Sequence, residues 1–183
     1  AHPAGTPLTL FYGSGTKAHN LDFTRELAPV LLALMADHPE LRLVIAGHLR
    51  LGPEFAAHAS RITQVGFIDD IVDYWSLLQA CDINLAVLSP GPFADCKSEI
   101  KWLEAAACAI PSVVSATATH ADVLCDGVDA FLAANQQEWR DGLEALIRDP
   151  ERRRDMGGQA RKKALRLYGI GKGAEMLAAR FGG

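Results

Sequence analysis

No apolar run in this sequence approaches the roughly 18 residues that a membrane-spanning helix needs. The first residues also lack the charged and apolar segments of a signal peptide. Positive charge is not in excess, because 18 Lys and Arg face 22 Asp and Glu and leave a formal net charge of −4. Nucleic-acid-binding domains concentrate positive charge, so no nucleic-acid partner is expected. We expect a cytoplasmic protein, with the inner face of the membrane as its alternative location.

Metal-binding motifs are missing as well. The four cysteines, at positions 81, 96, 108 and 125, form no C-x-x-C pair, which argues against zinc-binding and redox motifs. None of the six histidines belongs to an H-E-x-x-H pattern, and there is no Asp-x-Asp pair. We therefore expect four free thiols in a reducing compartment, with no metal and no cofactor.

The glycine-rich residues 13–16 follow a predicted strand but lack the common nucleotide-binding signatures. No third glycine completes G-x-G-x-x-G, and there is no G-K-[ST] of a P-loop. NAD and ATP sites of these kinds are therefore disfavoured. Glycine still permits a phosphate or a sugar to approach the backbone closely at Gly15 and Thr16. The alternative is a tight turn without a ligand.

What the sequence does contain is enough apolar material for a core. Its 183 residues are 49% hydrophobic, which suits one domain or one lobe of a larger enzyme. Residues 1–7 are polar and proline-rich and predict a linker, so we expect the domain to span residues 8–183.

Short apolar runs alternate with segments of helical spacing. The apolar runs predict strands over residues 8–12, 41–46, 62–65, 83–88, 112–115 and 130–133. Helices are predicted over residues 22–38, 53–60, 71–80, 97–109, 121–125, 137–148, 151–168 and 172–180. This alternation indicates an α/β fold with a doubly wound, mostly parallel, Rossmann-like sheet. Ligands of such sheets bind beyond the carboxyl ends of the strands, where the loops at 13–16, 66–70 and 89–98 would meet.

Residues 95–115 carry the most information about function. Lys97 and Ser98 stand where a helix is predicted to begin, and the free N–H groups of a helix N-terminus suit a phosphate. Glu104 lies among small residues further along, should be partly buried, and could accept from ribose hydroxyls. Two plainer interpretations stay open: an exposed, capped helix start at Lys97, and a backbone or basic donor for Glu104. We expect Glu99 and Lys101 to face water.

Two histidines lie at the same predicted edge of the sheet. His19 comes shortly after the glycine-rich turn, and His120 comes shortly after the strand predicted over 112–115. Each is a candidate ligand contact, with a purely structural role as the alternative.

With these residues in view, the chain resembles the C-terminal nucleotide-sugar-binding domain of GT-B fold glycosyltransferases. Within that fold it is most similar to the family-4, or group 1, enzymes that build surface polysaccharides and glycolipids. The resemblance covers about residues 8–168. The residues that carry it are 14–16 with His19, Asp22 and Phe23, then 65–67, 80–82, and 97–98 with 101–105 ahead of 110–114.

The resemblance implies where the ribose and the phosphates bind. Glu104 matches the second glutamate of the family's E-x7-E motif, which binds the donor ribose. Lys97 and Ser98 match the phosphate-binding backbone, and Gly15 with Thr16 matches the glycine loop near the diphosphate. The family's lysine after that loop has no clear counterpart here, so Lys97 is also the candidate for the missing positive charge.

The nucleobase and the transferred sugar are implied by other positions. Gly66, Phe67 and Ile68 match the segment that lies against the nucleobase. The family's first glutamate, which usually contacts the transferred sugar, stands eight positions before the second. In this chain the position eight before Glu104 is Cys96. Recognition of the donor sugar and a retaining stereochemical outcome therefore stay open.

Enzymes of this kind place the active site between two similar lobes, and this chain matches one of them. The implied function is donor binding in a glycosyltransferase that moves a sugar from a nucleotide diphosphate-sugar to an acceptor. The acceptor site would belong to an N-terminal lobe, so the isolated domain is expected to be inactive. The diphosphate leaving group would be stabilised without a metal, and the whole enzyme is expected to touch the membrane peripherally. The alternatives are a sugar-nucleotide epimerase or phosphorylase lobe and a non-catalytic flavodoxin-like module.

Overall fold

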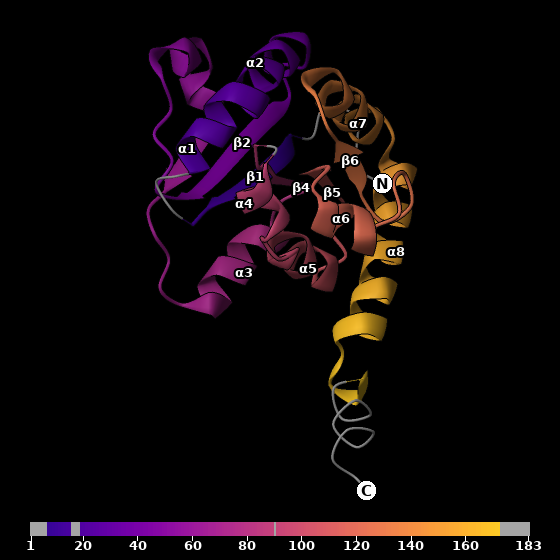
Figure 1. Ribbon diagram of the computed structural model, residues 1–183. Coiled ribbons are helices and arrows are strands. Elements are labelled where there is room, and N and C mark those ends of the chain that lie inside the picture. The colour runs from indigo at the N-terminus through magenta and orange to yellow at the C-terminus, as the bar shows by residue number, and fades with distance from the viewer. Residues whose placement is uncertain (1–6, 16–18, 90, 173–183) are drawn as a thin grey trace, which may run out of the picture.

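The computed structural model describes residues 7–15, 19–89 and 91–172. Six strands form one sheet in the order β3-β2-β1-β4-β5-β6, and every neighbouring pair runs parallel. The expected doubly wound, Rossmann-like fold is therefore confirmed (Figure 1). The strands are β1 (Leu8–Ser14), β2 (Leu41–Gly47), β3 (Ile62–Val65), β4 (Ile83–Ala86), β5 (Ser112–Ser115) and β6 (Phe131–Ala133).

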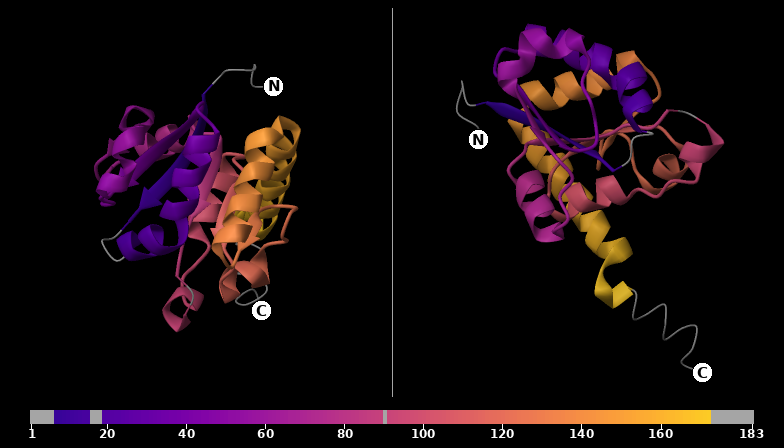
Figure 2. Two further views of the ribbon diagram at one scale, coloured as in Figure 1. Left: turned by 90° about the horizontal axis from the view of Figure 1, so that it is seen from above. Right: turned by 90° about the vertical axis from the view of Figure 1, so that its left-hand side faces the viewer.

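The sheet forms where the sequence is most apolar. All residues of β4 and β5 are buried, as expected for central strands that are covered on both faces. Figure 2 shows the sheet between two layers of helices. One layer contains α2 (Ala28–Asp37), the 3-10 helix η2 (Pro53–Arg61) and α7 (Gln136–Arg148). The other contains α3 (Ile71–Gln79), α5 (Ile100–Ala107) and α8 (Pro150–Tyr168).

The helix predicted over 22–38 is divided into three parts. α1 (His19–Asp22) runs into a π-helical turn, η1 (Phe23–Leu27), and α2 follows. Pro29, in the first turn of α2, has no N–H to donate and so cannot continue a regular helix from the preceding turn. The N–H of Ala28 donates to the Phe23 carbonyl, a bond that spans one residue more than in an α-helix.

Side-chain caps set the starts of other helices. Asp70 accepts from two backbone N–H groups at the start of α3, and Asp149 does the same for α8. α6 (Ala118–Val123) begins earlier than predicted because Thr117 caps it. Of the helix predicted over 172–180, all but the first residue lies outside the described residues.

The helix predicted over 97–109 is wrong at its start. A short helix, α4 (Pro92–Asp95), precedes it, and α5 begins three residues later than predicted. The N–H of Lys97 donates to the Ala94 carbonyl over 3.0 Å and closes the turn that ends α4. Lys97 and Ser98 therefore lie between two helices and not at the first turn of α5.

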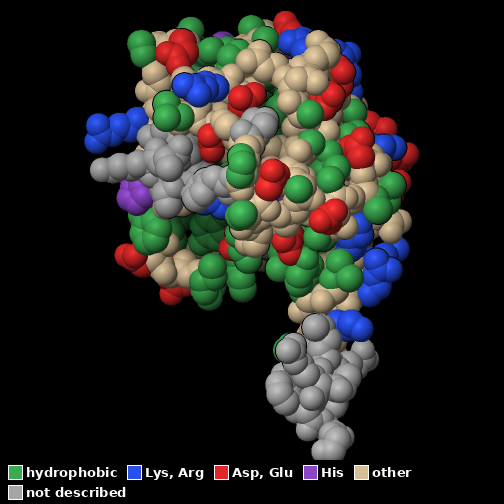
Figure 3. Space-filling view, in the orientation of Figure 1, with side chains coloured by type: hydrophobic (Ala, Val, Ile, Leu, Met, Phe, Trp, Pro, Cys, Tyr) green, Lys and Arg blue, Asp and Glu red, His purple; other side chains and the backbone are tan. Residues whose placement is uncertain are grey.

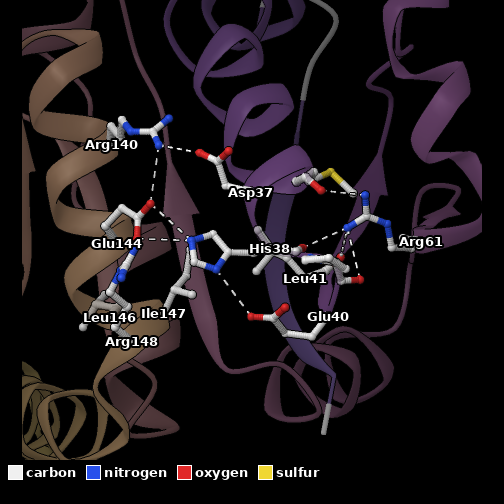
Figure 4. A network of polar contacts seen from close by, with 12 residues as sticks. Asp37, His38, Glu40, Leu41, Arg61, Arg140, Glu144, Leu146, Ile147 and Arg148 are labelled. Carbon is white, nitrogen blue, oxygen red and sulfur yellow. Dashed lines mark hydrogen bonds and ion pairs between the residues drawn. The ribbon is translucent and has the colours of Figure 1, made fainter. Parts of the chain in front are cut away.

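A polar network ties together the helices of one layer near the amino end of β2 (Figure 4). His38 Nε2 lies 3.1 Å from a carboxylate oxygen of Glu144, and Asp37 pairs with Arg140 over 2.6 Å, so the end of α2 is tied to α7. The Arg61 guanidinium donates to the carbonyls of residues 35, 38 and 41. These contacts fix the loop that enters β2, at the edge of the sheet away from the strands' carboxyl ends.

All four cysteines are free thiols, as predicted, and Cys81 is buried in the core. No helix in the part of the chain that the structure describes is long and apolar enough to cross a membrane.

Candidate functional site

A cleft of about 270 Å³ opens at the carboxyl ends of β1 and β2. The strand order reverses next to it, between β1 and β4, and ligands of doubly wound sheets bind beside such a point. The cleft therefore lies at the predicted edge of the sheet. Its lining consists of residues 13–15, 46–47 and 67–69, of Ile71 and Tyr74 from α3, and of Ile100, Lys101 and Glu104 from α5.

Lys101 is the most unusual side chain of the cleft. Its ammonium nitrogen is buried and has no hydrogen-bond partner among the described residues. It lies 5.2 Å from the centre of the Tyr12 ring. Burial, followed by the nearby charge of Lys97, lowers the pKa of Lys101 to about 8. The expectation that Lys101 faces water is wrong, because it precedes Glu104 by about one helical turn and shares its face.

Ser14 adds a second unsatisfied group. Its hydroxyl is buried at the end of β1 and also lacks a hydrogen-bond partner. Within the described ranges, Ser14 Oγ and Lys101 Nζ are the two buried side-chain polar atoms without a partner, and both residues line this cleft. Folded proteins pair nearly all such atoms, and a buried charge without a partner is unfavourable. A bound anion with several oxygen atoms would satisfy both groups.

Glu104 is held in the cleft by Tyr74 of α3. The Tyr74 hydroxyl donates to the Glu104 carboxylate, and Lys101 attracts the same group. Burial nevertheless raises the pKa of Glu104, because desolvation outweighs both partners. Burial and, second, the charge of Glu104 raise the pKa of Tyr74, so its phenol remains a donor. Glu104 is partly buried, as predicted.

Close approach of the backbone shapes this corner. A Cβ at Gly13 would lie 2.7 Å from the Tyr74 hydroxyl, and a Cβ at Gly47 would lie 2.0 Å from the Ser14 carbonyl oxygen. Gly47 also has a φ of 105°, which side-chain-bearing residues rarely adopt. A side chain at either glycine would displace the tyrosine or part β1 from β2. Gly15, by contrast, has open space around its Cβ position, which leaves room for a ligand.

One wall of the cleft is apolar and exposed. Phe67 is 60% exposed and stacks on His48, with ring centres 5.5 Å apart and ring planes 10° apart. Ile68 lines the cleft beside it. Gly66 does not line the cleft, and its carbonyl accepts from the N–H of Gly47 over 3.2 Å. Of the predicted nucleobase segment, the structure thus brings Phe67 and Ile68 to the site.

A second cavity of about 140 Å³ adjoins the cleft. Both spaces are lined by Ile100 and Lys101, so this lysine lies at their junction. The other residues that line the second cavity are Ala86, Leu88, Lys97, Ser98 and His120. Lys97 and Ser98 are therefore separated from Glu104 by Lys101.

The predicted phosphate-binding backbone at Lys97 and Ser98 needs a correction. The N–H of Lys97 is already donated to the Ala94 carbonyl, so it is not free for a phosphate. α5 begins at Ile100 without a side-chain cap, and the first N–H groups of a helix have no partner within it. The free amides therefore lie further along the chain than predicted, next to Lys101.

His120 is buried beside the second cavity, at the predicted edge of the sheet. Its Nδ1 lies 2.7 Å from the Ser115 carbonyl oxygen. Because a carbonyl only accepts, Nδ1 must carry the hydrogen. Burial lowers the pKa of His120, which keeps the ring neutral.

The remaining predicted residues are not brought to the cleft. Cys96 is exposed and lines neither of the two cavities. Thr16 lies outside the described residues, and so does the side chain of His19. Glu99, expected to face water, is half-buried and accepts from the hydroxyl of Tyr168.

Sequence reasoning missed three side chains of the cleft: Ser14, Tyr74 and Lys101. The spacing of Lys101 and Glu104 could have identified the lysine, because residues three apart share a helix face. The sequence places Ser14 in a glycine-rich turn, whereas β1 extends through it. Tyr74 carries no local signal, since only the packing of α3 against α5 brings it to Glu104.

A family model described as Glycosyl transferase-like matches residues 25–178 of the chain. The comparison with curated proteins gives no match. The family match favours the glycosyltransferase interpretation over the epimerase, phosphorylase and flavodoxin-like alternatives.

Solved structures share the fold at low sequence identity. Anabaena HepE in complex with UDP-glucose has a TM-score of 0.71 and 17% identity, over 96% of this chain and 49% of HepE. WaaG, a glycosyltransferase involved in lipopolysaccharide biosynthesis, has a TM-score of 0.65 and 19% sequence identity, over 96% of this chain and 48% of WaaG. The C-terminal domain of the group 1 glycosyl transferase LpcC from Francisella tularensis has a TM-score of 0.69 and 18% sequence identity, over 90% of this chain and 89% of the LpcC domain. The chain therefore has the fold of a GT-B C-terminal lobe and spans about half the length of HepE and WaaG.

Proposed function

Because the chain belongs to the glycosyl transferase-like family, we propose that it is the donor-binding lobe of an enzyme that moves a sugar from a nucleotide diphosphate-sugar to an acceptor. HepE holds UDP-glucose and WaaG acts in lipopolysaccharide biosynthesis. These relatives support a nucleotide-sugar donor and an acceptor on the way to a surface polysaccharide or glycolipid. This chain spans about half of HepE and of WaaG, which supports our placing the acceptor site in a second, N-terminal lobe.

The observation that carries the proposal is the unsatisfied pair Lys101 and Ser14. A diphosphate brings negative charge and several acceptor oxygens to one place, and so supplies partners for the buried ammonium and the buried hydroxyl. The uncapped start of α5 lies next to Lys101 and adds free N–H groups with partial positive charge.

The rest of the nucleotide fits on either side of the diphosphate. Glu104 is a partly buried acceptor for the ribose hydroxyls, and Tyr74 positions it. Phe67 and Ile68 form an apolar wall for the nucleobase. Gly15 leaves space beside the phosphates.

The charge of the leaving diphosphate is balanced without a metal or cofactor in this proposal. Lys101 takes the role that the sequence assigns to Lys97, and Lys97 is a second cation at the adjoining cavity. Among the described side chains, there is no group of three or more His, Cys, Asp or Glu residues that could hold a metal ion.

Exposed apolar side chains around the cleft support a covering lobe. Ile71, Val72 and Ile100 are each at least half exposed, and Trp75 is 41% exposed. Figure 3 shows hydrophobic side chains gathered over α3. Contiguous apolar patches of this kind mark interaction sites. We place the N-terminal lobe against this surface, so that the isolated chain binds the donor but does not transfer its sugar.

The location of the enzyme is part of the proposal. Four free thiols suit a reducing compartment. We place the enzyme in the cytoplasm, with a peripheral contact at the inner face of the membrane where a glycolipid acceptor would be found.

Titration calorimetry with UDP, GDP and ADP on this chain tests the proposal. We expect at least one nucleoside diphosphate to bind, with an affinity that EDTA leaves unchanged. Lys101→Met should weaken binding roughly ten- to a hundredfold, the scale of a charge-assisted hydrogen bond. Lys162→Met is the matched control, because Lys162 is exposed on α8 and lines neither cavity. Failure of all three nucleotides to bind, or equal affinities in wild type and Lys101→Met, would overturn the proposal.

A further inference from the structure

The second cavity begins where the proposed diphosphate site ends. Lys101 and Ile100 line both spaces, whereas Glu104 and Phe67 line the cleft and not the second cavity. A nucleotide with its ribose at Glu104 and its diphosphate at Lys101 therefore points its far end at the second cavity. This cavity, at about 140 Å³, has about half the volume of the cleft, so it suits one sugar ring and not a second nucleotide.

The lining of the second cavity combines apolar and polar surface. Leu88 and Ile100 are apolar lining residues, and Ser98, Lys97 and His120 are lining residues whose side chains carry polar atoms. Sites for small polar ligands have this composition, with a few placed polar groups on a mostly apolar wall.

His120 supplies a hydrogen-bond acceptor in this lining. Because its Nδ1 donates to the Ser115 carbonyl, the neutral ring carries its lone pair on Nε2. No described residue hydrogen-bonds that nitrogen. The residue is only 2% exposed, but Nε2 is not among the fully buried atoms that lack a partner, so this nitrogen keeps a small accessible area. A hydroxyl of a ligand in the cavity would be its donor.

We propose that His120 accepts a hydrogen bond from a hydroxyl of the transferred sugar, held in the second cavity. The inference rests on the proposed function, since it takes the diphosphate at Lys101 as given. Cys96, at the position where the resemblance expects a sugar-binding carboxylate, is exposed and lines neither space. His120 therefore replaces that carboxylate with one neutral acceptor, which selects the sugar through a single hydroxyl.

Paired titrations of this chain test the inference. The probes are UDP against UDP-glucose and GDP against GDP-mannose, and the pair whose nucleotide binds more tightly is used. His120→Asn keeps a donor for the Ser115 carbonyl but removes the acceptor at the Nε2 position. We expect it to weaken binding of the sugar nucleotide about tenfold and binding of the bare nucleotide less than twofold. His58→Asn, on η2 and away from both cavities, is the control and should change neither.

A second variant keeps the test valid if the buried substitution unfolds the protein. Ser98 is exposed and lines the second cavity, so Ser98→Trp should close that cavity without disturbing the core. It should cause the same selective loss of the sugar nucleotide. Equal losses for both ligands, no loss for either, or no preference of the wild type for a sugar nucleotide would overturn the inference. Failure of wild type to bind any nucleoside diphosphate would instead overturn the proposed function.

Discussion

Lys101 lies three residues before Glu104 on α5, and the two side chains line the same cleft. Although they attract each other, burial moves both toward their neutral forms, because it lowers the pKa of Lys101 and raises the pKa of Glu104. Burial of these two charges is therefore unfavourable for the folded protein. Binding sites often carry such a loss of stability in exchange for function.

Lys101→Met should stabilise the protein while it weakens nucleotide binding. The pKa of Lys101 falls from 10.5 to about 8 on folding, which corresponds to about 3 kcal/mol of stability lost at neutral pH. Methionine keeps the length and the packing of the side chain without its charge. We expect Tm at pH 7 to rise by roughly 5–10 °C.

The sign of this effect follows from the two pKa values. Below pH 8 the lysine is charged in both states, and the full penalty applies. As pH rises from about 8 to 10.5 the folded protein holds a neutral lysine, so the advantage of Lys101→Met should shrink. Scanning calorimetry at pH 7 and pH 10 measures both effects. A variant that melts at or below the wild-type temperature at pH 7 would contradict the buried charge.

Nucleotide affinity should fall above pH 8. In the free protein Lys101 loses its proton around a pKa of about 8, and only its charged form attracts the diphosphate. Between pH 7 and pH 9 we expect Kd for the nucleotide to rise about tenfold, with uptake of a proton on binding. Lys101→Arg should show no such change, because a guanidinium stays charged over this range. Calorimetry in buffers of different ionisation enthalpy counts the proton, and a wild-type affinity independent of pH would remove Lys101 from the phosphate.

The strands could be predicted closely from the sequence. β3 and β5 begin and end at the predicted residues, and the ends of the other strands differ by at most two. Buried parallel strands are short, continuous apolar runs, which is among the strongest local signals a sequence carries. The break in the first helix was less predictable, because the π-helical turn ahead of Pro29 depends on a single missing N–H.

The candidate site was only partly predictable. Glu104 stood out because a carboxylate among alanines needs donors. The position of Lys97 was misjudged because Pro92 starts a separate short helix, and the Lys97 N–H then closes the turn after it. Lys101 was misjudged because a lysine on an amphipathic helix usually faces water, and only the tertiary structure shows that its face lines the cleft.

Two adjacent glycines of α8 should respond to alanine in opposite directions. A Cβ at Gly157 would lie 2.0 Å from the carbonyl oxygen of Ala109, whose own φ is 57°. Because that atom belongs to the backbone of the tight turn after α5, Gly157→Ala should cost about 3 kcal/mol. A Cβ at Gly158 would meet nothing within 4 Å, so Gly158→Ala should gain up to about 1 kcal/mol of helix propensity. Urea unfolding compares the two, and equal stabilities would refute this packing of α8.

Glu104→Gln should weaken nucleotide binding through the ribose and not through the phosphates. If the carboxylate accepts from a ribose hydroxyl, glutamine keeps one acceptor oxygen but loses the charge, so the substitution weakens the same hydrogen bond that the deoxy nucleotide lacks, and their effects should not add. A cycle of wild type and Glu104→Gln against UDP, 2′-deoxy-UDP and 3′-deoxy-UDP should give a coupling energy of about 1 kcal/mol or more for one deoxy nucleotide.

Glu54 is an exposed carboxylate on η2, so Glu54→Gln is the control and should show no coupling. Tyr74→Phe leaves the carboxylate in place but removes its donor, so it should reduce the coupling without abolishing it. Additive losses for both deoxy nucleotides would mean that Glu104 does not touch the ribose.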